Sequence, residues 1–290
     1  MIRSFENFAV VDWSGQNVAK PPGLAVAFAS TGIQAPVLLK PRDGWSRQGV
    51  LEWLLRLAEA KTNVLVGLDL SPALPFVDRG AYFPDWADSP DDARALWALV
   101  DTMAADDLHL AANGFLNDHE VRRHFRHHGD CGDLFEAGRG RLRVCEYGQR
   151  DMGLSPQSCF NLVGAAQVGK SSLTGMRVLH RLRGLVPVWP FDPIPKSGPV
   201  IVEIYTSIAA RTAGLRKGLS KIRDGQMLDT ALDNLNSQAH APLHRYDDHS
   251  TDAIITTAWL RSGWKNCDFW EPTAMTPHIA RTEGWTFGVT

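Results

Sequence analysis

The sequence has few cysteines and no strong excess of either charge. Its four cysteines, Cys131, Cys145, Cys159 and Cys267, are scattered without paired spacing. This pattern excludes a disulfide framework and favours reduced thiols in a cytoplasmic protein. The formal net charge of −2 excludes a global field that would attract nucleic acid, so any phosphate-binding surface must be a local patch.

Long hydrophobic runs are also lacking. No apolar run approaches the length that crosses a membrane, and residues 1–6 lack the apolar core of a signal peptide. We therefore expect no membrane association. The 290 residues are 44% hydrophobic and 21% charged, which is ordinary for a globular protein, and they identify no protein partner.

Short apolar segments separated by glycine and proline predict the strands of one domain spanning residues 1–290. Strands are expected at residues 7–13, 24–29, 36–39, 64–70, 186–189 and 200–203. Helices are expected at residues 46–60, 89–105, 171–183, 209–223 and 249–261. Residues 75–156 interrupt this rhythm and are expected to form a mostly helical insertion or subdomain.

The order of these elements predicts an α/β fold. Three consecutive strands favour an antiparallel meander, whereas the later alternation of strand and helix favours parallel crossovers. A mixed sheet flanked by helices follows. This is the layout of the RNase H-like fold, expected here with a five-stranded sheet.

Several of the predicted core strands end in a carboxylate. Asp12 ends the first strand, Asp69 the fourth and Glu203 the last, and the acidic segment 247–252 opens the final helix. A carboxylate at the end of a core strand is costly unless something neutralises it, and several that converge usually indicate a divalent cation. Glu203 is the weakest member, because it could instead pair with an arginine.

The expected fold brings these acids together. The first and fourth strands would be neighbours, so Asp12 and Asp69 would lie side by side, while His249, Asp252 and Asp248 share one helical face. We therefore predict Asp12, Asp69, Asp252, His249 and Glu203 as catalytic residues, and Asp12, Asp69, Asp248 and Asp252 as ligands of Mg²⁺ or Mn²⁺. Taken singly, Asp12 and Asp69 are also typical turn formers, and Asp247 or Asp248 could simply cap the helix.

Five short blocks carry a resemblance to a known family. They are Asp12-Trp13-Ser14-Gly15, residues 67–75, Trp189-Pro190-Phe191-Asp192, Val202-Glu203-Ile204-Tyr205 and Thr251-Asp252-Ala253. Together they resemble the domain-of-unknown-function family 429, whose members are predicted RNase H-like, RuvC-related nucleases. The resemblance implies metal-binding acids at Asp12, Asp69 and Asp252. His249 stands where many relatives carry an aspartate, although a His-x-x-Asp pair also occurs in the resolvase branch of the superfamily.

A rival motif lies at Gly164–Ser171, which matches the phosphate-loop pattern of nucleotide-binding proteins. In such a site the backbone N–H groups wrap a phosphate, Lys170 reaches it and Ser171 binds Mg²⁺. The preceding strand, residues 160–163, is short and poor, and the motifs of a GTPase are missing downstream. The alternative readings are a packing turn between strand and helix, or an NTPase or kinase.

Two arginine-rich segments are candidates for contact with nucleic acid. One contains Arg139, Arg141 and Arg143, and the other spans Arg211–Arg223. Either could bind phosphates or be a solvated face. The sequence thus predicts a metal-dependent phosphodiesterase or nuclease, with a nucleotide-binding NTPase or kinase, or a catalytically inactive binding protein of the same fold, as alternatives.

Overall fold

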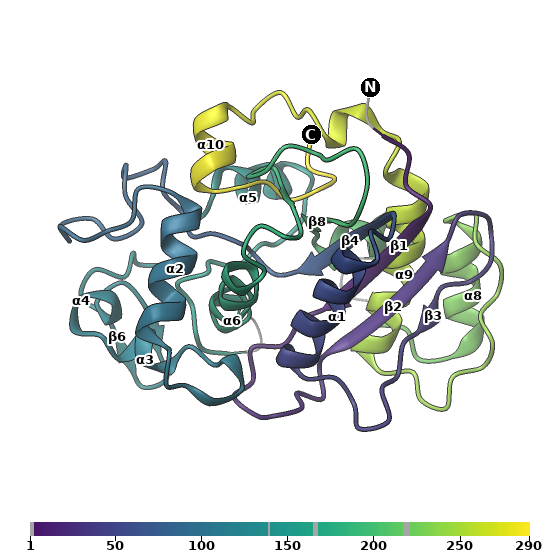
Figure 1. Cartoon of the computed structure of the whole chain (residues 1–290), viewed down its shortest axis with the longest axis horizontal. Coiled ribbons are helices and arrows are strands. Elements are labelled where there is room, and N and C mark those ends of the chain that lie inside the picture. Colours follow the sequence, from purple (N-terminus) through teal and green to yellow (C-terminus); the bar gives the residue numbers. More distant parts are fainter. Residues whose placement is uncertain (1–2, 139, 165–167, 217–220) are drawn as a thin grey trace.

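The chain folds around one mixed β-sheet (Figure 1). The structure, a computed structural model, describes residues 3–138, 140–164, 168–216 and 221–290. The strands of the sheet are β1 (Asn7–Asp12), β2 (Ala25–Ser30), β3 (Val37–Leu38), β4 (Val64–Asp69), β7 (Val188–Trp189) and β8 (Val200–Glu203). Their order is β3-β2-β1-β4-β8-β7. β2 is antiparallel to β1 and to β3, and the other neighbouring pairs are parallel.

The expected α/β class and mixed sheet are confirmed, but the expected number of five strands is wrong. The sheet has six strands, because Val188–Trp189 pairs in parallel with β8 and extends the edge opposite β3. A two-residue strand is defined by its backbone pairing and is too short to show a side-chain period. The sequence of β7 therefore does not show whether this segment joins the sheet.

Helices cover both faces of the sheet (Figure 1). The longer ones are α1 (Arg47–Glu59), α2 (Ala93–Met103), α5 (Val144–Asp151), α6 (Val168–Arg181), α7 (Thr206–Thr212), α8 (Gly225–Asp233), α9 (Asp248–Gly263) and α10 (Pro277–Thr282). The shorter ones are η1 (Leu108–Leu110), α3 (Asn113–Asn117), α4 (His119–Arg122) and η2 (Cys267–Phe269). The expected basic helix at 209–223 is wrong, because α7 already ends at Thr212.

Alternate residues of β1 face two separate hydrophobic cores. Ala9 and Val11 belong to the core that α1, α2 and α6 cover. Phe8 and Val10 belong to the core that α7, α8 and α9 cover. Side chains of a strand point alternately to opposite faces, so a strand that is apolar at every position must be buried on both sides. Asp12, the last residue of β1, therefore lies at the end of a strand that is covered on both faces.

Residues 75–156 contain the expected helices and also a small antiparallel hairpin, β5 (Arg126–His127) with β6 (Asp130–Cys131). The aromatic residues Phe83, Phe115 and Phe125 pack in the same core as α1 and one face of the sheet. The segment therefore shares its core with the sheet.

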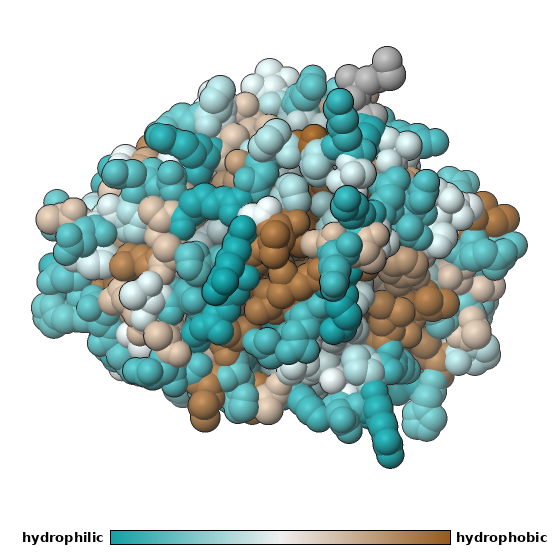
Figure 2. Space-filling view, in the orientation of Figure 1, coloured by the Kyte–Doolittle hydropathy of each residue, from teal (hydrophilic) through white to brown (hydrophobic). Residues whose placement is uncertain are grey.

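The visible face of the molecule mixes polar and apolar side chains. Figure 2 shows apolar residues gathered near α1 and the neighbouring strands, with hydrophilic residues around them. Within the described ranges, no helix combines the length and the apolar character that spanning a bilayer requires.

Candidate functional site

Two aspartates lie side by side where neighbouring parallel strands end. In the register of β1 and β4, Asp12 is the direct partner of Asp69. Asp12 is only 5% exposed. The crossover through α1 makes the two strands parallel, so their carboxyl ends reach the same edge of the sheet. The structure thus brings the first two predicted ligands together, as expected from the order of the elements.

The N-terminal end of α9 supplies the other predicted side chains. The helix packs on β1 and β2, and the side chain of Asp247 caps it by accepting a hydrogen bond of 2.9 Å from Ser250 N. The Nδ1 atom of His249 lies 3.3 Å from Asp12 Oδ2. A Cβ atom at Gly23 would stand 2.9 Å from the imidazole ring, so this position in the loop before β2 needs glycine.

The pKa values indicate that these carboxyl groups lie close enough to influence one another's ionisation. Burial, with the charges of Asp12 and Asp252, raises the pKa of Asp69 well above its usual range. Burial and the charge of Asp12 raise the pKa of Asp252 to about 7. Asp12, Asp69 and Asp252 therefore form one group, which we call the acidic cluster. Burial is the largest cause of the raised pKa in all three, and neighbouring carboxylates add to it at Asp69 and Asp252.

His249 is the residue that most offsets the raised pKa of Asp12. Burial raises the pKa of Asp12, and the hydrogen bond and positive charge of His249 partly offset that rise. The same hydrogen bond raises the pKa of His249. The imidazole side chain is 48% exposed, so solvent reaches it while its Nδ1 atom faces Asp12. The hydrogen bond thus orients Asp12 and favours the protonated form of His249.

Asp248, predicted as a metal ligand, is engaged elsewhere. It forms ion pairs with Lys221 and with Arg223, the latter at 2.8 Å. Burial acts to raise the pKa of Asp248, but the hydrogen bonds from these two cations outweigh it and lower the pKa. As the first residue of α9, Asp248 lies beside residues 221–223 and its charge is already satisfied.

Glu203 also has an internal partner, as the alternative reading of this residue anticipated. Arg143 Nη1 donates a 2.8 Å hydrogen bond to Glu203 Oε2, and Thr286 Oγ1 donates one of 2.7 Å to Oε1. Arg143 also donates a 3.0 Å hydrogen bond to Glu146 Oε1. All three charged side chains are buried. The structure therefore places Glu203 in a buried ion-pair network.

The arginine-rich segment of residues 139–143 does not form an exposed basic surface in its described part. Arg141 and Arg143 are buried, and Arg141 pairs with Asp78 at 2.6 Å. Arg139 lies outside the described residues. Because the guanidinium groups of Arg141 and Arg143 are used inside the fold, these two residues form neither a phosphate-binding surface nor a solvated face, the two alternatives considered from the sequence. The charge pattern alone does not distinguish a buried arginine from an exposed one.

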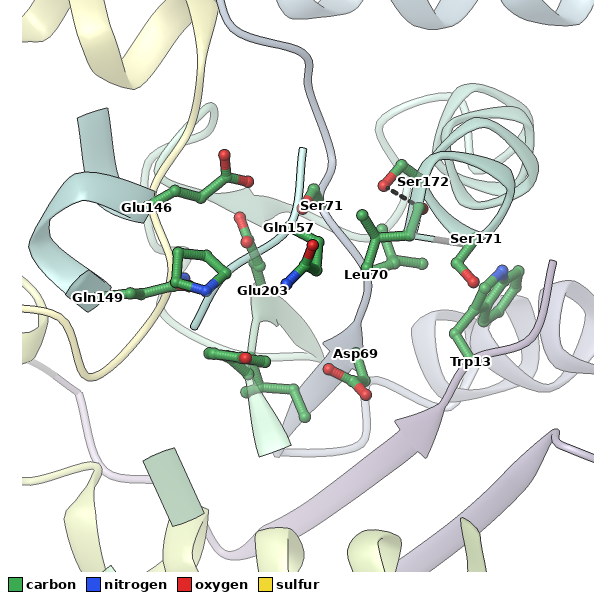
Figure 3. Close-up of a pocket in the computed structure, with 14 residues that line it drawn as sticks. Trp13, Asp69, Leu70, Ser71, Glu146, Gln149, Gln157, Ser171, Ser172 and Glu203 are labelled. Atoms are coloured by element: carbon green, nitrogen blue, oxygen red, sulfur yellow. Dashed lines mark hydrogen bonds between the residues drawn. The ribbon is translucent and has the colours of Figure 1, made fainter. Parts of the chain in front are cut away.

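Two hollows flank the acidic cluster. The first has a volume of about 160 Å³ and includes Asp69, Trp13, Tyr205 and Glu203 in its wall. Figure 3 shows Asp69 at the end of its strand, between Trp13 and Ser171 on one side and Glu203, Gln149 and Glu146 on the other. The second, of about 470 Å³, is lined by His249, Lys40, Trp45 and Arg245. No local pattern in the sequence marks Lys40, Trp45 or Arg245 as functional residues.

The phosphate-loop pattern is described only in part, because residues 165–167 lie outside the described residues. Residues 160–163 form no strand beyond an isolated bridge between Asn161 and Arg126. A Cβ atom at Gly15 would stand 2.5 Å from the backbone nitrogen of Ser171, so the loop after β1 packs directly on the first turn of α6. This close approach favours a packing turn at the start of α6.

The described residues contain no group of three or more histidine, cysteine, aspartate or glutamate side chains arranged to hold a metal ion. The donor types in the acidic cluster nevertheless suit a hard divalent cation, which binds oxygen ligands. Among the described residues, no cationic side chain lies within ion-pair distance of Asp69. Comparisons of the chain with protein-family models, with curated proteins and with solved structures found no match.

Proposed function

We propose that this chain is a divalent-metal-dependent phosphodiesterase or nuclease with an RNase H-like fold, related to the domain-of-unknown-function family 429. The observation that carries the proposal is the pairing of Asp12 with Asp69 at the ends of adjacent parallel strands, with Asp252 close enough to raise the pKa of Asp69. The strand order β3-β2-β1-β4-β8, with β2 antiparallel to its neighbours, supports the fold.

The acidic cluster suits Mg²⁺ or Mn²⁺, with Asp12, Asp69 and Asp252 as the residues that would hold it. Small side-chain rotations would have to complete the site, because the described residues do not hold a preformed metal group. A divalent ion there would lower the pKa of a water molecule and neutralise charge on the leaving oxygen. His249 keeps Asp12 oriented through its hydrogen bond, and its half-exposed imidazole ring is reached by solvent.

The surroundings of the acidic cluster suit a nucleic acid strand. Lys40 and Arg245 line the hollow that also contains His249, and Trp45 contributes an aromatic ring to the same wall. Lys221 and Arg223 pair with Asp248, the residue before His249. Cations that follow a backbone and an aromatic ring on which a base can stack are the usual means of binding a single strand. We therefore expect the strand to run through this hollow toward Asp69.

The proposal is tested by cleavage of labelled single-stranded DNA, duplex DNA, RNA and a four-way junction, with Mg²⁺, with Mn²⁺ and with EDTA. We expect metal-dependent cleavage of at least one substrate, and a loss of at least a hundredfold in Asp69→Asn and in Asp252→Asn. The matched control is Asp233→Asn, which alters an exposed aspartate at the end of α8 and should cleave like wild type. Absence of cleavage, or unchanged cleavage in Asp69→Asn, would refute the proposal.

A second candidate is a catalytically inactive binding protein of the same architecture. It is favoured by the lack of an arranged metal group among the described residues. Under this alternative, the protein would bind a strand or small molecule in the hollow beside His249 without cleaving it. Binding of a labelled oligonucleotide that is unaffected by metal and by Asp69→Asn would support this second candidate.

A further inference from the structure

Two buried arginines on different helices each leave one nitrogen atom without a partner. Arg47 on α1 is 1% exposed and Arg177 on α6 is 0% exposed. The Nη2 atom of each is buried and donates to no hydrogen-bond acceptor among the described residues. A buried N–H group without a partner costs free energy, and two in one region indicate that something binds there.

The remaining donors of the two guanidinium groups hold the same short turn. Arg47 Nε donates to the carbonyl of His109 at 2.7 Å, and Arg177 Nη1 donates to the carbonyl of Ala111. These carbonyls are two residues apart, so the two guanidinium groups lie within several ångströms of each other. Burial, and then the nearby charge of Arg177, lower the pKa of Arg47 to about 10.

The region has more positive than negative charge. Arg177 and Arg181 share one carboxylate, that of Asp101, at 2.8 and 2.9 Å. Arg47 donates only to carbonyl groups, and no described carboxylate lies within ion-pair distance of it. Three guanidinium groups therefore face one carboxylate. A buried cation that lacks a counter-charge is strongly unfavourable, so the missing charge has to come from outside the chain.

We propose that the Nη2 groups of Arg47 and Arg177 bind a small inorganic anion of the halide type, with chloride as the natural occupant. A water molecule would satisfy the hydrogen bonds but would leave the charge uncompensated, whereas an anion does both. Both arginines are closed to solvent, so the ion must be small enough to fit within the packing. This requirement excludes phosphates, nucleotides and nucleic acid.

The anion site would support two features of the fold. The turn that both arginines hold contains His109 and Leu110, with φ angles of 58° and 53°, which are unusual for residues with side chains. Such strain persists only where the surroundings hold the backbone in place. Arg47 Nη1 also donates to the carbonyls of Ser14 and Gln16, each at 2.9 Å, in the loop that follows Asp12. The site therefore stabilises the base of that loop, whatever chemistry the acidic cluster performs.

The first experiment is a thermal melt at constant ionic strength in sodium chloride, sodium bromide and sodium gluconate. We expect the midpoint in either halide to exceed that in gluconate by about 2–5 °C, with a saturable dependence on halide concentration. Arg177→Lys keeps a charge but loses the forked donor, and should lose the halide response. Arg261→Met is the matched control, because Arg261 is a largely buried arginine that donates to Gln34 O and Ser237 Oγ. Its halide response should equal that of wild type.

A crystal grown in sodium bromide gives a direct test that needs no variant. An anomalous peak within hydrogen-bond distance of both Nη2 atoms would establish the site. Equal midpoints in halide and gluconate, a halide response that persists in Arg177→Lys, or an ordered water without anomalous signal between the arginines would each overturn the proposal.

Discussion

Two carboxylates at the ends of neighbouring strands have opposite surroundings. Glu203 ends β8 and pairs in register with Leu68, the residue before Asp69. Glu203 accepts hydrogen bonds from Arg143 and Thr286, and the arginine is itself fully buried. Asp69 accepts a hydrogen bond from the backbone of Thr206 and has three carboxylates, those of Asp12, Asp252 and Glu203, as charged neighbours. Among the described residues, Glu203 therefore has a cation as its direct partner and Asp69 does not.

This difference separates a structural acid from a candidate ligand. A buried carboxylate that is paired and hydrogen-bonded within the chain has no free capacity for an external cation. When the charged neighbours of a carboxylate are other carboxylates, binding of a cation stabilises its ionised form. Sequence position alone does not reveal this, because both acids end an apolar strand.

The largest expected effect comes from removing Arg143, the buried cation that pairs with Glu203. Arg143→Met leaves Glu203 and Glu146 buried without their cation, and we expect a loss of about 3–5 kcal/mol in the free energy of unfolding. Chemical denaturation measures it. The matched control is Arg123→Met, since Arg123 pairs with Glu120 and Asp133 on the surface, where water screens the charges, so its loss of stability should be much smaller. Equal losses would mean that the buried network is no more important than a surface pair.

The next effect concerns the acidic cluster, to which Asp69 belongs. A divalent ion that binds only the folded acidic cluster adds about 2.7 kcal/mol to the free energy of unfolding at a hundredfold excess over its dissociation constant. Wild type should therefore melt higher in millimolar Mn²⁺ or Mg²⁺ than in EDTA, and Asp12→Asn, Asp69→Asn and Asp252→Asn should lose most of that increment. Asp233→Asn should keep it. The same response in all five proteins would show that the ions act elsewhere.

The stability of the metal-free protein should depend on pH through the acidic cluster. The pKa of Asp252 is raised to about 7, above its unfolded value of about 3.9, so the folded state binds more protons between these two pH values. The free energy of unfolding is then highest near pH 4 and falls as pH rises to about 7, by up to about 1.4 kcal/mol per pH unit for this group. His249, whose pKa is also raised, loses its contribution in the same direction.

Denaturation in EDTA between pH 4 and pH 8 measures this slope, and Asp252→Asn should make it shallower. A slope of the opposite sign attributable to Asp252 would mean that a cation within the chain already neutralises the cluster.

The smallest expected effect is a gain in stability. Asp69→Asn removes one negative charge from the acidic cluster while preserving shape, so the metal-free protein should gain about 1 kcal/mol or less at pH 8. Asp12→Asn should gain less, because His249 already offsets the charge of Asp12. Denaturation of both variants in EDTA gives the comparison. A clear loss in Asp69→Asn would place Asp69 with Glu203 as a structural acid.

The sequence was sufficient to predict features that follow from local pattern and element order. Apolar runs located the strands, and the crossover between β1 and β4 predicted that Asp12 and Asp69 would be neighbours. Asp247 was one of the two residues expected as possible caps of the last helix, and it caps α9. These inferences rest on the periods and end preferences of helices and strands, which are encoded within a few residues.

The partners of charged side chains could not be predicted in the same way. Arg143 reaches Glu203 from 60 residues earlier in the chain, and Lys221 reaches Asp248 across 27. Such pairs depend on how whole elements pack, and no period within either segment identifies them. The arginine-rich segment near residue 141 was predicted to be a surface for the same reason.

The position of α9 in the chain has a consequence for the newly made protein. Asp12 and Asp69 lie in the first quarter of the sequence, whereas Asp252 arrives with α9, after most of the chain has been synthesised. A nascent chain therefore has two neighbouring carboxylates but not the third, and α9 must pack on β1 and β2 before the acidic cluster is complete. If the cluster cleaves nucleic acid, its activity begins only after α9 has been synthesised and has packed on the sheet.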